Sequence, residues 1–153
     1  MPGLLPHVDP EGLLEYSVVY TDRALNHMSA SFQSVMREIS GTLKDVYSAD
    51  AVVVVPGSGT FGMEAVARQF ANDATCYVLR NGWFSYRWSQ ILESGGFAAA
   101  EQVFKAARGD ESPQAPFAPV PVEEFTAAIR EGRPDIVFAP HVETSSGMML
   151  PDS

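Results

Sequence analysis

A glycine-rich turn follows a run of four valines in this chain, and its residues could hold a phosphate group. Residues 52–55 are typical of a buried strand, and Gly57-Ser58-Gly59-Thr60 then runs directly into a helical pattern. The first N–H groups of a helix lack intrahelical partners and carry partial positive charge, and glycines let an anion approach them closely. Ser58 and Thr60 add hydroxyl donors at the same place. The sequence therefore predicts a phosphate-bearing ligand on residues 57–60.

Residues 57–62 also fit the G-x-G-x-x-G pattern of dinucleotide-binding folds. That fingerprint requires an acidic residue about 20 positions later to hold the ribose hydroxyls. This chain has Arg80 and Asn81 there, so NAD is disfavoured, whereas NADP remains open through Arg80. A tight strand-to-helix turn that serves packing alone and binds no ligand also remains open.

A second segment, residues 80–88, follows a predicted strand and holds four aromatic side chains and two arginines. An aromatic residue in such a loop could lie flat against a heteroaromatic ring, and Trp83 and Phe84 occupy the loop position. Trp88 is expected to belong to the hydrophobic core instead. The segment is therefore a candidate ring-binding loop.

Residues 141–147 form the third candidate segment, with hydroxyl groups, a carboxylate and an imidazole within seven positions. Polar groups at the exit of a buried strand need partners, and a ligand is one source of them. Turn chemistry alone would also explain residues 145–147. His141 is expected to have a structural role, and these residues by themselves define no catalytic triad, metal site or carboxylate pair.

Hydrophobic periodicity predicts the elements that position these three segments. Helices are predicted over residues 29–47 (capped by Ser29), 60–71, 83–93 and 122–131, and strands over 51–55, 75–80, 97–104 and 135–139. The proline-rich residues 107–121 are expected to form a surface loop, and residues 1–28 an N-terminal arm. The alternation predicts an α/β fold with a mostly parallel sheet flanked by helices. Ligands bind such sheets beyond the carboxyl ends of the strands, where loops 56–60, 81–84 and 140–147 are expected to meet.

Composition narrows the classes of function. The 153 residues suffice for one domain, and a content of 46% hydrophobic and 19% charged residues suits a globular core. The formal net charge of −9 argues against a nucleic-acid-binding protein, because that affinity depends on lysine and arginine. No apolar run approaches the roughly 18 residues of a membrane span. Cys76, the one cysteine, is expected to be a small core residue in a reducing, cytoplasmic environment.

Taken together, the three segments resemble the class V aminotransferases, which are pyridoxal 5′-phosphate (PLP) enzymes that include alanine–glyoxylate and serine–pyruvate aminotransferases. The resemblance runs from about Asn26 to Pro151. Residues 26–29 resemble the segment ahead of the family's long helix, and residues 57–60 with Glu64-Ala65 resemble its phosphate-binding turn. Residues 81–84 resemble the segment whose aromatic residue stacks on the pyridine ring, and residues 141–147 resemble the loop whose hydroxyl group reaches the cofactor.

The resemblance implies a cofactor site and a reaction. It implies that Ser58, Gly59 and Thr60 anchor PLP, that Phe84 holds its ring, and that Thr144 touches the ring. The implied activity moves an amino group from a small amino acid such as alanine or serine to a 2-oxo acid such as glyoxylate or pyruvate. A cytoplasmic homodimer without nucleic-acid or membrane partners is implied for the whole enzyme.

The lysine content departs from the family pattern. In the family, the lysine that binds the cofactor and the arginine that holds the substrate carboxylate lie in the second half, whereas this chain has only Lys44 and Lys105, at neither position. Residues 29–153 are therefore expected to be part of the PLP-binding large domain, truncated before the Schiff-base lysine and inactive alone. An NADP-binding Rossmann-type reductase domain and a non-catalytic α/β interaction domain remain the alternatives.

Overall fold

A three-stranded parallel sheet organises the larger of two structural units. The computed structural model describes residues 30–151, and the chain divides into two units between Val54 and Val55. In the second unit the strand order is β2 (Ala100–Lys105), β1 (Thr75–Arg80), β5 (Ile136–Phe138). The central strand, β1, pairs in parallel with β2 along its whole length and with β5 from Cys76 to Val78.

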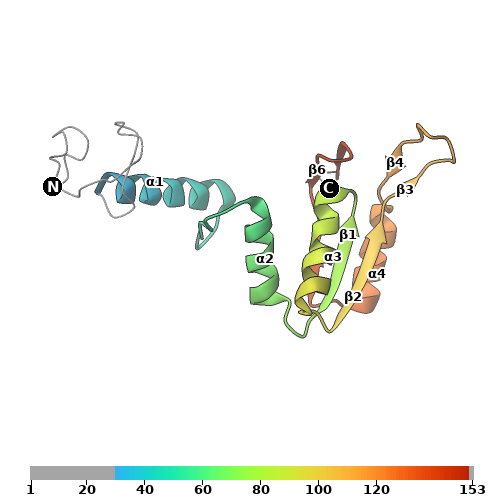
Figure 1. The fold of residues 1–153 in the computed structure, drawn as a ribbon, viewed down its shortest axis with the longest axis horizontal. Helices are drawn as coiled ribbons and strands as arrows, with labels where there is room; N and C mark the ends of the chain where they lie inside the picture. Colours follow the sequence, from blue (N-terminus) through green and yellow to red (C-terminus); the bar gives the residue numbers. More distant parts are fainter. Residues whose placement is uncertain (1–29, 152–153) are drawn as a thin grey trace. The chain divides into compact units, whose positions relative to one another are not determined.

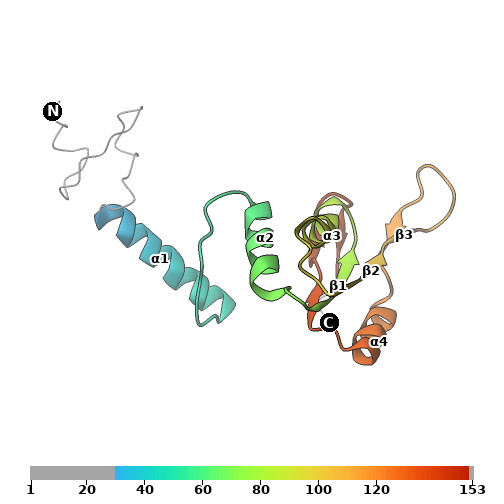
Figure 2. The same ribbon diagram turned by 60° about the horizontal axis from the view of Figure 1, so that its bottom comes forward.

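Helices α3 (Trp83–Gly95) and α4 (Val122–Gly132) cover opposite faces of this sheet (Figures 1 and 2). Helix α3 connects β1 to β2, and α4 connects β2 to β5, so the two connections run in opposite directions along the sheet. Because parallel connections are right-handed, opposite directions place the two helices on opposite faces. The predicted α/β fold with a parallel sheet flanked by helices is confirmed.

Side-chain alternation along β1 divides the core between the two faces of the sheet. Cys76 and Val78 are fully buried and belong to a cluster with Leu92 of α3. On the same face, Trp88 stacks on Phe138 with ring centroids 4.2 Å apart. The expectations that Cys76 and Trp88 belong to the core are therefore confirmed.

The opposite face of β1 packs against α4 through aromatic side chains. Tyr77 contacts Phe104 of β2 with ring centroids 5.3 Å apart, and Phe104 contacts Phe125 of α4 at 4.9 Å. Gly132, at the end of α4, leaves room for the Tyr77 hydroxyl, which a Cβ atom at this position would overlap.

Helix α2 (Gly59–Phe70) packs against α3 within the second unit. Ala67 and Ala71 are fully buried and join the cluster that contains Val78 and Leu92. Small residues on this face of α2 allow the two helices to approach closely. The helix predicted after the glycine-rich turn is thus present, and its first residue is Gly59.

Residues 51–55 were predicted to form a buried strand, and this prediction is wrong for the described structure. The side chain of Val53 is 83% exposed, and those of Val54 and Val55 are also exposed. A strand needs a neighbour to pair its N–H and C=O groups, and no strand among residues 30–151 pairs with this segment. The β-branched residues therefore have strand propensity without a pairing partner.

Two short antiparallel pairs lie where only loops were predicted. Strand β3 (Ala107–Arg108) pairs with β4 (Phe117–Ala118), inside the proline-rich stretch. Strand β6 (Val142–Glu143) pairs with β7 (Met148–Met149), so the third candidate segment contains the first strand and the turn of a small hairpin. This hairpin gives residues 143–147 a defined backbone.

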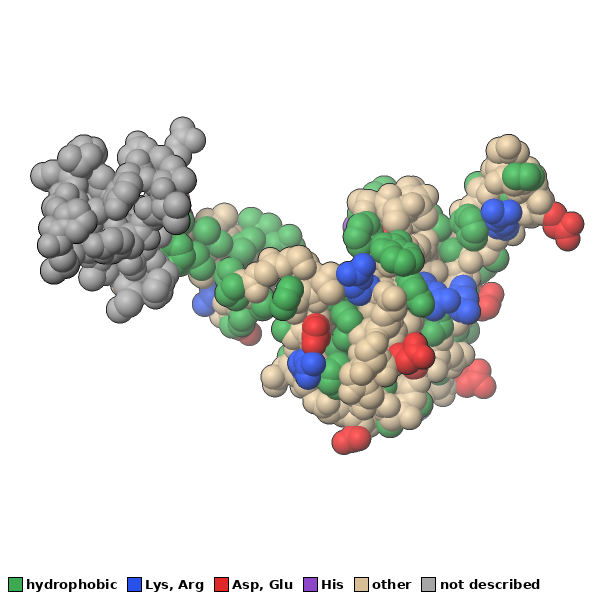
Figure 3. All heavy atoms as spheres, in the orientation of Figure 1, with side chains coloured by type: hydrophobic (Ala, Val, Ile, Leu, Met, Phe, Trp, Pro, Cys, Tyr) green, Lys and Arg blue, Asp and Glu red, His purple; other side chains and the backbone are tan. Residues whose placement is uncertain are grey.

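The first unit contains helix α1 (Ala30–Tyr47), which has no buried residue. Hydrophobic side chains are exposed along it, including Val46 at 68% and Tyr47 at 74%, and they form the green surface of α1 in Figure 3. The N-terminal arm, residues 1–28, and the predicted cap Ser29 lie outside the described residues. Among the helices of residues 30–151, none is long and apolar enough to cross a membrane.

Candidate functional site

The carboxylate of Glu143 lies at the first turn of α3. Its Oε1 atom accepts a hydrogen bond from Phe84 N (3.2 Å), and Oε2 accepts hydrogen bonds from Ser85 N (2.8 Å) and Ser85 Oγ (2.7 Å). The Ser145 hydroxyl, two residues further along the same loop, also donates to Oε1. Because Gly82, the residue before α3, has no side chain to cap the helix, Glu143 takes the place of a local cap.

Glu143 is a negatively charged group at neutral pH, although the residue is only 1% exposed. Burial by itself raises its pKa. The hydrogen bonds from Ser145, Ser85 and Phe84 favour the charged form more strongly and lower the pKa of the carboxyl to about 2. The helix dipole of α3 favours the carboxylate as well. A carboxylate of this chain therefore occupies the N-terminus of α3, which is not available to an external anion.

Gly82 allows the loop before α3 to approach residues 143–145. A Cβ atom at Gly82 would lie 2.7 Å from Glu143 Cγ and would also overlap Ser145 Oγ. A further hydrogen bond, from Trp83 N to Ser145 Oγ (2.7 Å), joins the same two loops. The expectation that loops 81–84 and 140–147 meet at one edge of the sheet is therefore confirmed.

The N-terminus of α2 differs from that of α3, because its N-cap residue makes no side-chain capping hydrogen bond in the described part of the chain. Ser58 is the N-cap residue, with an extended backbone (φ −86°, ψ 170°), and its side chain makes no capping hydrogen bond. A Cβ atom at Gly59 would meet no atom within 4 Å, so the backbone there is open to approach. Gly57 turns the chain into the helix with φ +136°, a conformation that favours glycine. The first turn of α2 thus offers N–H groups to an external acceptor.

Arg87 connects α3 to the first turn of α2. Its Nη1 atom donates a hydrogen bond to Thr60 Oγ1 over 3.0 Å, and its Nε is buried without a hydrogen-bond partner among the described residues. On α3, Arg87 lies about one turn after Phe84, whose amide is bound by Glu143. A continuous set of contacts therefore links the glycine-rich turn, the aromatic segment and the hairpin turn, and it brings a positive charge next to the Thr60 hydroxyl.

The residues predicted to bind the cofactor lie at the surface of these three segments. The side chain of Phe84 is 53% exposed, and Trp83, the other aromatic candidate, is 57% exposed and contacts Tyr86 with ring centroids 5.8 Å apart. The other four predicted residues are exposed or, in one case, half-buried: Ser58, Gly59, Thr144 and Thr60. All five are accessible to a ligand, and their role in binding stays a prediction.

Arg80 is the first residue of the aromatic segment, and His141 is the first residue of the third segment. The guanidinium of Arg80 lies over the ring of Tyr86, 4.7 Å from its centroid, so its charge is held against α3. His141 is exposed, and its carbonyl oxygen accepts a hydrogen bond from Leu150 N in the hairpin. Within residues 30–151, no group of three or more His, Cys, Asp or Glu side chains is placed to hold a metal ion.

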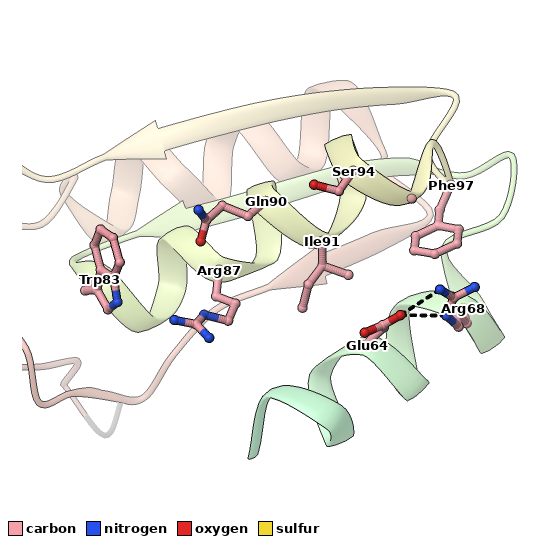
Figure 4. A pocket seen from close by; sticks show the side chains of 9 residues that line it. Glu64, Arg68, Trp83, Arg87, Gln90, Ile91, Ser94 and Phe97 are labelled. Atoms are coloured by element: carbon pink, nitrogen blue, oxygen red, sulfur yellow. Dashed lines mark hydrogen bonds and ion pairs between the residues drawn. The ribbon is translucent and has the colours of Figure 1, made fainter. Parts of the chain in front are cut away.

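A cavity of about 450 Å³ lies between α2 and α3 (Figure 4). Trp83 and Arg87 line it from α3, and Glu64 and Arg68 line it from α2, where they form an ion pair over 2.6 Å. None of the five residues predicted to bind PLP lines this cavity. The cavity is therefore distinct from the glycine-rich turn. Arg87 lines the cavity and also donates a hydrogen bond to Thr60 in that turn.

The roles of Glu143, Ser85 and Arg87 were not predicted from the sequence. The sequence does contain a signal for the capping role of Glu143. Helix α3 begins after a glycine, which cannot cap it, and Glu143 is the one carboxylate in residues 140–147, the loop that follows the neighbouring strand β5. Arg87 had no such signal. Its partner Thr60 lies 27 positions away in sequence, on another helix, and only the packing of α2 against α3 brings the two together.

Two solved structures of aminotransferases resemble this chain. A ureidoglycine–glyoxylate aminotransferase from Bacillus subtilis has a TM-score of 0.64 and 21% sequence identity, over 83% of this chain and 31% of the enzyme. An alanine–glyoxylate aminotransferase from Nostoc sp. has a TM-score of 0.63 and 26% identity, over 83% of this chain and 32% of the enzyme.

The chain thus spans about a third of the length of these enzymes and matches their structure over that part. The resemblance to class V glyoxylate aminotransferases that the sequence indicated is confirmed at the level of structure. No protein-family model and no curated protein sequence matches this chain.

Proposed function

We propose that this chain forms part of a PLP-dependent aminotransferase of class V. The reaction proposed is transfer of an amino group from a small amino acid such as alanine or serine to a 2-oxo acid such as glyoxylate or pyruvate. The structural match to two glyoxylate aminotransferases supports it. The observation that carries the proposal is the set of hydrogen bonds, through Arg87 and Glu143, that joins the three segments with motif resemblance.

The donor groups at α2 fit the phosphate of PLP. The first turn of α2 has N–H groups without a side-chain cap, and the space around Gly59 is open. Thr60 Oγ1 accepts a hydrogen bond from Arg87, so its own hydrogen remains available to a phosphate oxygen. The guanidinium of Arg87 adds positive charge at this place. Helix N-terminus, hydroxyl groups and cation together form the donor set that a phosphate group requires.

The exposed ring of Phe84 and the hydroxyl of Thr144 fit the pyridine ring. Phe84 lies at the start of α3, where Glu143 binds its amide, and Thr144 follows Glu143 directly in the hairpin turn. An exposed aromatic face can stack on a heteroaromatic ring, and this stacking restricts the plane of that ring. We assign Phe84 to ring stacking and Thr144 to a contact with the ring.

In this proposal the residues of the chain bind and orient, and the cofactor supplies the chemistry. When bound, PLP provides an electron sink that stabilises negative charge on the substrate carbon carrying the amino group. Ser58, Gly59 and Thr60 hold the phosphate, and Phe84 holds the ring. The chain spans about a third of the two aminotransferases that it resembles, and we propose that the lysine that binds the cofactor covalently belongs to the part of such an enzyme that the match does not cover.

A homodimer in the cytoplasm, acting on free amino acids and 2-oxo acids, completes the proposal. The single cysteine, Cys76, is fully buried in the core, which suits a reducing compartment.

A titration of the 153-residue chain with pyridoxine 5′-phosphate tests the cofactor assignment. This compound has the phosphate and ring of PLP but no aldehyde, so it cannot react with Lys44 or Lys105. We expect NMR shift changes at the amides of Gly59 and Thr60 and at Phe84 and Thr144. The double variant Ser58→Ala/Thr60→Ala should weaken binding, whereas Thr126→Ala on α4, as matched control, should not.

Two other outcomes would favour the alternative functions. Shift changes at the same turn with NADPH, but none with pyridoxine 5′-phosphate, would favour a reductase domain. Absence of a response to either compound would contradict the cofactor assignment and favour an interaction domain.

A further inference from the structure

We propose that Glu143 is a positioning residue that locks the first turn of α3, which carries Phe84, to the hairpin turn carrying Thr144. The roles of Phe84 and Thr144 in ligand binding rest on the proposed function. The lock itself is inferred from hydrogen bonds within the chain. Glu143 belongs to none of the five predicted cofactor contacts, and its side chain is directed at the first turn of α3.

The lock consists of hydrogen bonds to one carboxylate, from the first turn of α3 and from the hairpin turn. From the α3 side, Phe84 N donates to Oε1, and Ser85 N and Ser85 Oγ donate to Oε2. From the hairpin side, the Ser145 hydroxyl donates to Oε1, and Ser145 Oγ in turn accepts a hydrogen bond from Trp83 N. The first three residues of α3 are thus tied to the two residues that flank Thr144.

The absence of a local cap makes this carboxylate necessary for α3. Gly82 cannot provide a side-chain acceptor, and a larger residue there would overlap Glu143 and Ser145. Ser85 Oγ, the nearest hydroxyl, accepts hydrogen bonds from Asn81 N and Gly82 N, which leaves the amides of Phe84 and Ser85 to Glu143. Buried amide groups without an acceptor are costly, so the loop geometry depends on this one residue.

For a bound ring, the lock fixes the position of Phe84 relative to Thr144. Strands β1 and β5 are neighbours in the sheet, so the loops that follow them leave at the same edge. Without Glu143, the hydrogen bond from Trp83 N to Ser145 Oγ and the main-chain connections through two separate strands would remain to relate Phe84 to Thr144. With Glu143 in place, the amide of Phe84 and the residue next to Thr144 share one acceptor group, which limits the movement of the stacking ring.

Amide hydrogen exchange in the 153-residue chain, with three glutamate variants, tests the lock. Glu143→Gln keeps the size but removes the charge and places an NH₂ group among donors, whereas Glu143→Asp keeps the charge with a shorter reach. Glu124→Gln, an exposed carboxylate in the first turn of α4, is the matched control. We expect exchange of the Phe84 and Ser85 amides to be at least about tenfold faster in Glu143→Gln, with Val78 in β1 unchanged.

A second measurement shows whether the lock serves ligand binding. The affinity for pyridoxine 5′-phosphate should fall by about tenfold in Glu143→Gln, because Phe84 is no longer held in place before the ligand binds, and by less in Glu143→Asp. If Glu143 were needed only for packing, Glu143→Gln, which keeps its size, would bind the ligand at least as tightly as the shorter, charged Glu143→Asp. If the Val78 amide also exchanges faster in Glu143→Gln, the variant is unfolded more widely. Ser145→Ala then tests the lock, and we expect faster exchange of the Trp83 and Phe84 amides in it.

The outcomes separate this inference from the proposed function. Unchanged exchange at Phe84 and Ser85 in Glu143→Gln, or unchanged exchange at Trp83 and Phe84 in Ser145→Ala, would overturn the lock. If the wild-type chain does not bind pyridoxine 5′-phosphate but Glu143→Gln releases these amides, the lock stands and the cofactor assignment fails. If the wild type binds and Glu143→Gln binds equally well, the positioning role is wrong and the proposed function stands.

Discussion

Arg87 Nη1 donates a hydrogen bond of 3.0 Å to Thr60 Oγ1, and this contact ties α3 to the first turn of α2. It matters because the two residues belong to different candidate segments. Thr60 is part of the glycine-rich turn, and Arg87 belongs to the aromatic segment. A ligand that bridges the two segments would therefore meet a hydroxyl group and a cation that already contact each other.

Replacing Arg87 by methionine should weaken binding of pyridoxine 5′-phosphate by about tenfold, because a charge-assisted interaction with phosphate is lost. Methionine keeps an unbranched apolar stem, so packing of this stem between α2 and α3 is largely preserved. Titration followed by NMR provides the dissociation constant. The matched control is Arg130→Met, in the last turn of α4. Equal loss of affinity in both variants would show that overall charge, and not Arg87 itself, is responsible.

Replacing Gly82 by alanine should separate the α3 start from the hairpin turn. A Cβ atom would lie 2.7 Å from Glu143 Cγ, and the neighbours that it meets are already bound in the lock. We expect a loss of about 1–3 kcal/mol in the free energy of unfolding, measured with urea. Gly62→Ala in α2, where a Cβ would meet nothing within 4 Å, is the control and should be neutral or stabilising. Equal stability of Gly82→Ala and wild type would contradict the close approach.

The stability of the second unit should depend on pH through Glu143. Its pKa is lowered from 4.5 to about 2 on folding, so the stabilisation is fully present above about pH 4.5 and is lost as the pH falls towards 2. The size of this contribution is about 3 kcal/mol at neutral pH. Urea unfolding between pH 7 and pH 2.5 should show a steeper decline for wild type than for Glu143→Gln. Parallel declines would mean that Glu143 titrates alike in the folded and unfolded chains.

Replacing Leu92 by alanine should destabilise the second unit by about 2–5 kcal/mol. Leu92 is 2% exposed and packs in the cluster with Val78, Ala67 and Ala71, so the variant leaves a cavity between α2, α3 and the sheet. The adjacent Glu93 is exposed, and Glu93→Ala serves as the control in the same helix. A change below about 1 kcal/mol for Leu92→Ala would indicate that this cluster is not the core of the unit.

The local hydrophobic pattern of the sequence was sufficient to predict the strands of the sheet and its two flanking helices. Residues 75–80 form the strand that their apolar run predicted, and Trp83–Gly95 and Val122–Gly132 form helices close to the predicted bounds. Gly96 ends α3 with a left-handed backbone (φ 59°), a conformation typical of glycine at the end of a helix. These features depend on neighbours in sequence, which periodicity and turn residues describe well.

Features that depend on distant partners were not predictable in the same way. Residues 51–55 have strand propensity, but a strand also needs a pairing partner, and the described residues provide none. The sequence showed that Glu143 lies in a polar loop, but not that its carboxylate caps another element. The contact of Arg87 with Thr60 depends on helix packing and on side-chain reach, which no spacing rule describes. The candidate segments were thus predictable, whereas the contacts that join them required the structure.

The central claim is that the ring of PLP stacks on Phe84 while its phosphate lies on the first turn of α2. Intermolecular nuclear Overhauser effects between pyridoxine 5′-phosphate and the 153-residue chain test it most directly. We predict cross-peaks between the methyl group on the ligand ring and the ring protons of Phe84, which Phe84→Leu removes, together with shifts at Gly59 and Thr60. Cross-peaks to other aromatic residues without any to Phe84, or binding that leaves Gly59 and Thr60 unchanged, would contradict it.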